Sequence, residues 1–278
     1  MGKSPQKRLS GAGAWALLAA LLVLSIAAGG IAMDRDELGK VLKSIPPNGP
    51  FWKYGNVVMR SRTRKAGMAP VVFAHWSHRA RYTCRVCHLE LGFSMRMGDT
   101  GITRAQYLEG KYCGACHNGS IAFTVADGPK GNCKKCHLEN TKELEEKFSD
   151  FSQSLPMAPF GNGIDWAKAL KSGLIQPVDV LGSTSAAVSF PKTLKQPLKL
   201  GTSSPRSDVT FSHQDHFAEL DCSSCHPDIF NIKRKSTADF TMDSNIYGNF
   251  CGACHMMVAF PMNDCRRCHQ SMNNSTSY

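Results

Sequence analysis

The cysteines of this 278-residue chain all occur in one recurring pattern. Each of the twelve belongs to a pair separated by two residues, and a histidine directly follows every pair. Two thiols about one helical turn apart can each form a thioether to a haem vinyl group, while the adjacent imidazole lies under the iron, so this spacing is the attachment signature of c-type haem. The cysteines are Cys84, Cys87, Cys113, Cys116, Cys133, Cys136, Cys222, Cys225, Cys251, Cys254, Cys265 and Cys268, and the histidines are His88, His117, His137, His226, His255 and His269.

Two other uses of paired cysteines fit this pattern less well. A zinc ribbon does not need a histidine after every pair. A disulfide framework has no reason to place every cysteine at one spacing. The sequence therefore predicts six covalently bound c-type haems, with the cysteines as attachment points and the six adjacent histidines as proximal iron ligands.

The four remaining histidines are predicted to be distal iron ligands. They form two H-x-x-H pairs, His75 with His78 and His213 with His216, each just before a haem motif. Because the chain has only ten histidines, at most four of the six haems can have two histidine ligands. The other two need another sixth ligand or have an open site.

Methionine is the preferred substitute, because a thioether can bind haem iron and raises its potential. Met242 lies nine residues before Cys251 and is the predicted ligand in the second half of the chain. In an ungapped alignment of the two halves its counterpart is Arg104, which cannot serve. Met95 and Met97 are the alternatives in the first half, and ordinary core packing is the other use of these methionines.

The haem motifs belong to an internal repeat. Residues 73–78 (FAHWSH) match residues 211–216 (FSHQDH), and residues 112–117 (YCGACH) match residues 250–255 (FCGACH) at the same separation. This indicates duplication of a unit that carries three haems. We therefore expect a first module over 33–140, a connecting segment over 141–204 and a second module over 205–278.

The connecting segment is too long for a bare linker. Asn140 and Glu143 indicate a helix start, followed on one face by Leu144, Phe148 and Phe151. Asp165 can cap a short helix that begins with Trp166 and stops at Gly173, and later prolines favour extended coil. We expect this segment to pack on the haem modules rather than to act as a tether.

Regular structure is expected to be sparse. Residues 71–73 and 209–211 are short strand candidates, and each haem motif is expected to open a helical turn. The predicted fold class is mostly coil and short α-helices with minimal β-structure, built around haem as a multihaem cytochrome c with a duplicated triheme module. The porphyrins then supply much of the core, so the apoprotein is expected to be largely unfolded.

The N-terminus predicts export. Lys3, Lys7 and Arg8 precede an uncharged run over 9–33, and the small residues at 30–32 suit a cleavage site. Residues 1–32 are therefore a signal peptide or, since the run can cross a bilayer, an N-terminal membrane anchor. Either form places the remainder outside the cytoplasm, in the periplasm, held at the inner membrane or exported to the cell surface.

The net charge of +11 would by itself suggest a nucleic acid as partner. Loss of residues 1–32 lowers the charge to +8, twelve ionised haem propionates lower it to −4, and six ferric centres restore it to +2. The basic residues are thus partners for haem carboxylates, and no nucleic-acid partner is expected.

Each repeat resembles a triheme c-type cytochrome module of the c-seven kind, which is related to the tetraheme c-three cytochromes of metal-reducing and sulfate-reducing bacteria. The resemblance rests on the Phe-x-His-x-x-His start and the three motifs that follow it. It implies that His75 serves the haem on Cys84 and Cys87, and that His78 serves the haem on Cys113 and Cys116. The corresponding assignments in the second repeat are His213 for the haem on Cys222 and Cys225, and His216 for the haem on Cys251 and Cys254. Such modules usually carry a further histidine before the second motif, which this sequence lacks in both copies.

Closely packed haems predict electron transfer rather than enzymatic catalysis. The expected partners are redox proteins, namely an inner-membrane donor and a downstream cytochrome or reductase, in a setting of anaerobic respiration. Two alternatives are a multihaem terminal reductase acting at a haem with an open sixth site, and a subunit of a haem filament.

Overall fold

The structure is a computed structural model, and it describes residues 51–96, 98–126, 132–182, 189–200, 208–231 and 240–270. The predicted signal peptide or anchor and Met97 lie outside the described residues. Within the described ranges, no helix is long and apolar enough to cross a membrane.

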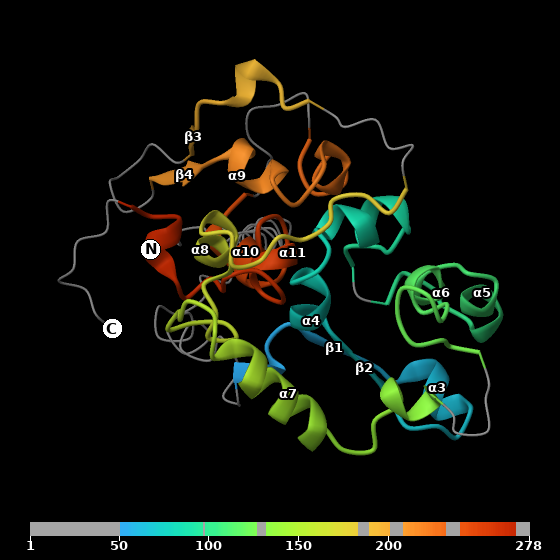
Figure 1. Cartoon of the computed structure of the whole chain (residues 1–278). Helices are drawn as coiled ribbons and strands as arrows, with labels where there is room; N and C mark the ends of the chain where they lie inside the picture. The colour runs from blue at the N-terminus through green and yellow to red at the C-terminus, as the bar shows by residue number, and fades with distance from the viewer. Residues whose placement is uncertain are drawn as a thin grey trace, which may run out of the picture. The chain divides into compact units, whose positions relative to one another are not determined.

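The first module consists of one short hairpin and several short helical elements, most of which follow it (Figure 1). Strand β1 (Asn56–Met59) pairs antiparallel with β2 (Val71–Ala74), with Asn56 opposite Ala74. The predicted strand at 71–73 is confirmed, whereas β1 was not predicted. The helical elements of the module are η1 (Phe51–Lys53), α3 (Ser61–Lys65), α4 (His75–Arg79), η2 (Val86–Glu90), α5 (Arg104–Leu108), α6 (Cys113–Cys116) and η3 (Asn132–Lys135).

The second module repeats this order. Strand β3 (Leu198–Leu200) pairs antiparallel with β4 (Val209–Phe211), so the predicted strand at 209–211 is confirmed. β3 lies within the segment that was predicted to connect the modules, although its pairing places it with the second hairpin. The helical elements are α9 (His213–Phe217), η5 (Cys222–Ser224), α10 (Met242–Ile246), α11 (Gly252–His255) and η6 (Cys265–Arg267).

The connecting segment packs against the first module, as predicted. It forms α7 (Lys142–Ser152), α8 (Trp166–Lys171) and the short turn η4 (Lys192–Leu194). The residue before α7 is Thr141 rather than Asn140, whose side chain accepts a bond from the Lys142 N–H instead. Asp165 caps α8 as predicted, because its carboxylate accepts a bond from the Lys168 N–H at 3.0 Å.

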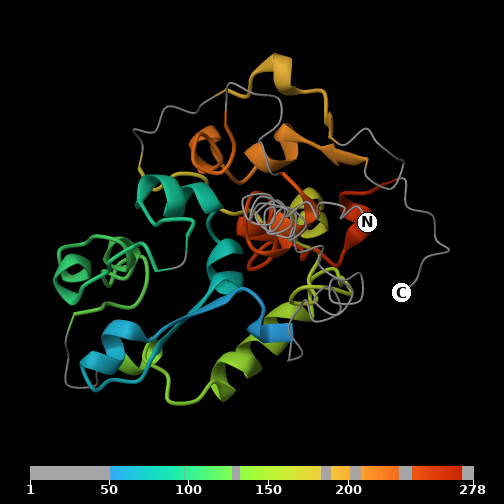
Figure 2. The same cartoon turned by 180° about the vertical axis from the view of Figure 1, so that it is seen from behind.

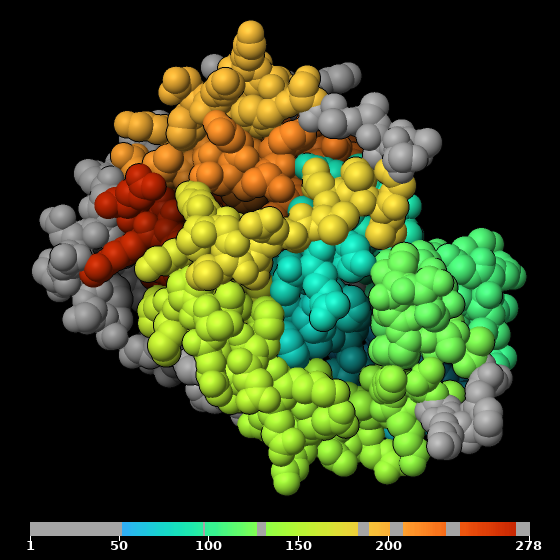
Figure 3. Space-filling model, in the orientation of Figure 1, coloured from blue at the N-terminus to red at the C-terminus, as the bar shows by residue number. Residues whose placement is uncertain are grey.

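The apolar side-chain core lies between the first hairpin and this segment. Trp76 of α4 contacts Phe148 and Phe151 of α7, with ring centroids 5.3 and 5.2 Å apart. Residues of 142–182 form a surface band beside the first module (Figure 3). All buried members of this core come from residues 52–175, and the described part of the second module contributes none. The haem motifs therefore lie outside the main side-chain core.

Candidate haem-binding sites

The two H-x-x-H pairs occupy matching positions at the end of a strand. β2 leads directly into α4 and β4 leads into α9, which places the histidines of each pair one turn apart (Figure 2). Phe73 packs between His75 and His78, with ring centroids 4.7 and 4.4 Å away. Phe211 holds the second pair in the same way, at 4.9 and 4.5 Å. The repeat seen in sequence is thus also a repeat in side-chain packing.

One histidine of each pair faces the histidine of a haem motif. The ring centroids of His78 and His117 lie 6.3 Å apart, and those of His216 and His255 lie 6.2 Å apart. Two imidazoles that bind one metal ion from opposite sides, each at about 2 Å, have ring centroids roughly 6 Å apart. Both separations therefore leave room for one iron between the rings.

The other histidines of the pairs lie near the first motif of their own module. His88 lies close enough to His75, and His226 close enough to His213, to contribute to the lowered pKa of His75 and of His213. Burial is the main cause of the lowered pKa in both His75 and His213, and it brings the pKa of His75 to about 4. Burial likewise lowers the pKa of His255 to about 4. These imidazoles are neutral at pH 7, the form that binds a metal.

The hydrogen bonds of these rings leave the same nitrogen free. A backbone carbonyl can only accept, so a ring whose Nδ1 bonds to it carries its proton there and keeps Nε2 for a metal. In the four proximal histidines of the first and second motifs, Nδ1 donates to the carbonyl of a phenylalanine four to six residues further on, at 2.7–3.1 Å. The pairs are His88 with Phe93, His117 with Phe123, His226 with Phe230 and His255 with Phe260.

Three of the four predicted distal histidines are oriented in the same manner. His75 donates to the carbonyl of Gly55 at 2.6 Å, His78 to that of Ala74 at 2.9 Å, and His216 to that of Ser212 at 2.8 Å. Nδ1 of His213 is buried without a hydrogen-bond partner among the described residues. Except at His213, the chain thus holds the paired imidazoles with Nε2 available.

The cysteine side chains lie at the start of helical turns. The predicted turn is confirmed at every motif, and all twelve thiols are unbridged. Burial raises the pKa of Cys87, Cys113 and Cys254 to about 11 and that of Cys84 and Cys251 to about 12. Thiols with raised pKa values are poor nucleophiles at neutral pH, which is the wrong property for a redox dithiol.

The second motif of each module is held by unusually close backbone packing. A Cβ on Gly114 would lie 1.8 Å from the Tyr107 carbonyl oxygen, and a Cβ on Gly252 would lie 1.8 Å from that of Asn245. Only glycine fits at this approach. The aromatic residue before each motif, Tyr112 or Phe250, has a positive φ of 51° or 47°, a strained conformation for a bulky side chain.

The third motif is tied to the strand that leads to the H-x-x-H pair. The Val72 N–H bonds to the Cys136 carbonyl at 3.1 Å, and the Thr210 N–H bonds to the Cys268 carbonyl at 3.2 Å. His137 donates to the Ala69 carbonyl at 2.8 Å. Nδ1 of His269 is buried without a partner among the described residues. No other imidazole in the described ranges packs against His137 or His269, so the structure brings together no second histidine at these motifs.

Met242 and Arg104 occupy equivalent places. Each is the first residue of the helix before a second motif, Met242 in α10 and Arg104 in α5, and each follows a capping threonine. Met242 is half-buried, whereas Arg104 is exposed. Met95 is half-buried in the loop before α5. The structure thus matches the ungapped alignment of the repeats at this position.

These residues fit a haem group. Two pairs of half-buried imidazoles, His78 with His117 and His216 with His255, face each other at a separation that one metal ion spans, and the cysteine pairs of the haem motifs lie beside them in sequence. Residue spacing did not indicate the phenylalanine carbonyls that orient the rings, although a phenylalanine four to six residues after each such histidine is a pattern visible in the sequence. The Gly55 and Ala69 carbonyls carry no such signal.

Comparison with known proteins agrees with this site. The sequence model of the family described as cytochrome c7 and related cytochrome c matches residues 71–138 and 209–271. A c7-type three-heme cytochrome domain of known structure is 37% identical to the chain. The match covers 91% of that domain and 30% of this chain, at a TM-score of 0.26. A search of curated proteins finds no match.

Two longer structures are also similar. The C-terminal hexaheme fragment of GSU1996 is 26% identical, with 77% of this chain and 96% of the fragment covered at a TM-score of 0.25. The N-terminal hexaheme fragment of GSU1996 is 26% identical, with 78% of this chain and 99% of the fragment covered at a TM-score of 0.24.

The fold and the paired motifs define a multihaem c-type cytochrome, and the chain belongs to the family of cytochrome c7 and related cytochromes c. Proteins of this family are electron carriers that bind c-type haem, and c-type cytochromes are typically extracytoplasmic.

Proposed function

We propose that the protein is a hexahaem cytochrome that passes electrons along closely packed haems in the periplasm or at the cell surface. Bound haem supplies one-electron redox chemistry, and the chain supplies position, ligands and burial. The donor would be a redox protein of the inner membrane, to which residues 1–32 could anchor the chain, and the acceptor a downstream cytochrome or reductase.

The facing imidazoles carry this proposal. His78 with His117 and His216 with His255 are separated by the distance that one metal ion spans, and their Nδ1 atoms are engaged by backbone carbonyls. An iron with two histidine ligands has no site for a substrate, which suits electron transfer rather than catalysis.

The remaining ligands are assigned from the electrostatic proximity of the rings and from the positions of the methionines in the sequence. We assign His75 with His88 and His213 with His226 to the first haem of each module, because each pair of rings is close enough to interact electrostatically. We assign Met242 with His269 to the third haem of the second module. For the haem on Cys133, Cys136 and His137, Met95 and Met97 are the sixth-ligand candidates.

Intact mass measurement and optical spectroscopy of the exported protein test the proposal together. We expect a mass that includes six haems, and spectra dominated by low-spin iron with two axial ligands. A mass with fewer haems, or spectra of mainly five-coordinate iron, would contradict the hexahaem electron carrier. The same mass shows whether residues 1–32 are retained.

One observation favours a reductase as the second candidate. Arg104 stands where the second module has Met242, so the haem on Cys133 and Cys136 lacks the equivalent ligand. An open iron there could bind a small oxyanion or a metal ion. Carbon monoxide binding to the reduced protein at one haem, with turnover of such a substrate, would favour this function over simple transfer.

A further inference from the structure

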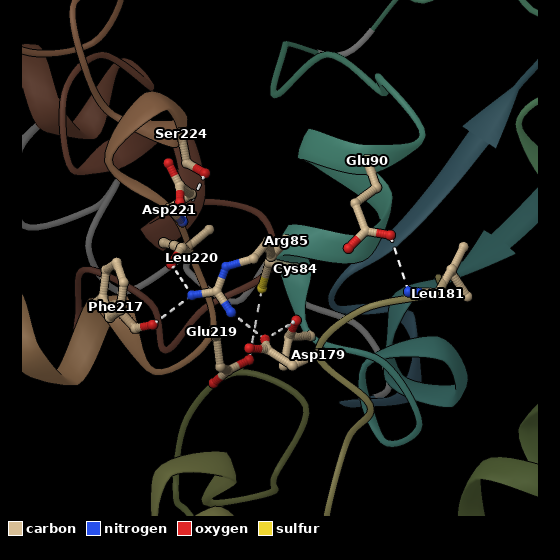
Figure 4. A network of polar contacts seen from close by, with 11 residues as sticks. Cys84, Arg85, Glu90, Asp179, Leu181, Phe217, Glu219, Leu220, Asp221 and Ser224 are labelled. Atoms are coloured by element: carbon tan, nitrogen blue, oxygen red, sulfur yellow. Dashed lines mark hydrogen bonds and ion pairs between the residues drawn. The ribbon is translucent and has the colours of Figure 1, made fainter. Parts of the chain in front are cut away.

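The two modules meet through the first haem motif of module 1 and the region after α9 of module 2 (Figure 4). The backbone N–H of Arg85, inside the motif, donates to the Glu219 carbonyl at 3.0 Å. The Arg85 guanidinium donates to the carbonyls of Phe217 at 2.8 Å and Leu220 at 2.5 Å, and it also pairs with Asp179 of the connecting segment. Hydrogen bonds to backbone on both sides fix this junction more firmly than exposed side-chain contacts could.

Arg79 forms a second connection at the same place. It is the last residue of α4, one position after the H-x-x-H pair, and its side chain is only 14% exposed. Its guanidinium lies over the Trp166 ring at 4.4 Å, pairs with the Glu219 carboxylate at 3.3 Å and donates to the Val258 carbonyl at 3.3 Å. One side chain therefore joins the first module, the connecting segment and two separate parts of the second module.

Gly55, whose backbone orients the predicted distal ligand His75, also lies at this junction. The Gly55 carbonyl accepts the Nδ1 proton of His75. A Cβ on Gly55 would lie 3.7 Å from the Met257 carbonyl oxygen, so this backbone is in direct contact with the second module. The adjacent Tyr54 hydroxyl donates to the Ala259 carbonyl at 2.7 Å. The contacted segment directly follows the second haem motif of module 2.

Backbone hydrogen bonds connect this contacted segment to the second motif of module 2. The N–H groups of Val258 and Ala259 donate to the Cys254 carbonyl at 2.9 and 3.0 Å. On the side of module 1, the Cys84 thiol lies 3.6 Å from the Glu219 carboxylate that pairs with Arg79. The contacts of Arg79, Tyr54 and Gly55 therefore run from the first motif of module 1 to the residues that directly follow Cys254 and His255.

We propose, on the basis of the electron-transfer function above, that the modules exchange electrons between the site of Cys84 and Cys87 and the site of Cys251 and Cys254, with Arg79 and Glu219 as positioning residues. One electron leaves the ferrous haem at one site, which becomes ferric, and reduces the ferric haem at the other, with no bond or proton moved. The crossing point thus joins a first motif to a second motif, not the end of one module to the start of the next. Tight contact at this point matters because electron tunnelling weakens steeply with distance.

Stepwise reduction of the haem-loaded full chain, followed by NMR of the haem methyl groups, tests this order. Reduction of one haem shifts the midpoint potential of its neighbours, most strongly for the nearest. Across the modules, we expect the largest shift between the haems on Cys84 and Cys87 and on Cys251 and Cys254. A larger shift for any other inter-module pair would overturn the inference. If reduction of one haem changes the midpoint potential of no other haem, even within the same module, the proposed function itself is contradicted.

The Glu219→Gln variant tests the positioning role. Removal of the carboxylate charge beside Cys84 should raise the midpoint potential of the first haem of module 1 and reduce the inter-module shift. Glu143→Gln on exposed α7 is the matched control and should change neither. Unchanged values in Glu219→Gln would refute the role of this residue. If Glu219→Gln fails to load six haems by mass, Arg79→Lys can be used instead; it keeps the positive charge and should preserve the inter-module shift. The wild-type measurement by itself still identifies which two haems exchange electrons between the modules.

Discussion

Replacement of Asp165 by asparagine should destabilise the protein by removing one charge at the contact between α8 and module 2. The Asp165 carboxylate caps α8 and also binds Arg267, which lies inside the third haem motif of module 2, at 2.9 and 3.4 Å. Asparagine caps a helix as well as aspartate does, so the substitution leaves the cap and removes the ion pair.

The expected loss follows from the burial of this pair. The Arg267 and Asp165 side chains are 28% and 20% exposed, so the pair is worth more than an exposed one, which contributes up to about 1 kcal/mol. A hydrogen bond to a charged group contributes about 1.5–3 kcal/mol, and the asparagine carbonyl keeps part of it. We expect Asp165→Asn to lower the free energy of unfolding by about 1 kcal/mol, and Asp165→Ala by about 2 kcal/mol because the cap is lost as well.

The effect should depend on pH in a defined direction. Burial by itself would raise the pKa of Asp165, but hydrogen bonds from Arg267 and the Lys168 N–H outweigh it and hold that pKa below its usual value. A lowered folded-state pKa gives stability that is complete above the unfolded pKa of about 4 and is lost as the pH falls through the folded value. Asp165→Asn should therefore cost stability at pH 7, and this cost should disappear once the pH has fallen below the folded-state pKa of Asp165.

Denaturant unfolding of the haem-loaded protein, followed by circular dichroism and haem absorption, measures these differences. Glu143→Gln, which removes an exposed ion pair with Lys147 on α7, is the control and should leave the unfolding midpoint unchanged. The reasoning is refuted if Asp165→Asn unfolds like the wild type at pH 7, or if its deficit is the same at low pH.

Three further outcomes are expected. Met242→Ala should abolish a weak long-wavelength absorption band of the oxidised protein and allow carbon monoxide to bind the reduced protein. Arg104→Met should add such a band and prevent carbon monoxide binding in module 1. Unchanged spectra in Met242→Ala would show that this methionine is not a ligand. A protein in which both Cys265 and Cys268 are serine should lose the mass of one haem and keep the others, and an unchanged mass would contradict attachment there. The apoprotein should be largely unfolded by circular dichroism, because the described core cluster lies within residues 52–175 and the second module contributes no residue to it. A near-native spectrum without haem would show that side chains suffice.

The sequence by itself determined the chemistry of the protein, because haem attachment depends on residues only a few positions apart. The C-x-x-C-H spacing, the H-x-x-H pairs and the repeat are all local patterns, and so are the strands at β2 and β4 and the cap at Asp165. Short strands such as β1 and β3 have no such signal, since each is stabilised mainly by its partner in the hairpin.

The tertiary structure decided which distant groups meet. Arg79 meets Glu219 from 140 residues away, although nothing in their spacing requires it. The family resemblance already implied that His78 and His117 share a haem, and the structure adds the separation of their rings. The carbonyls that orient the imidazoles are backbone atoms present in every residue, so only the path of the chain selects Gly55 for His75 and Ala69 for His137. The contact between the first motif of module 1 and the segment around Glu219 in module 2 likewise depends on how the modules pack, which no local pattern encodes.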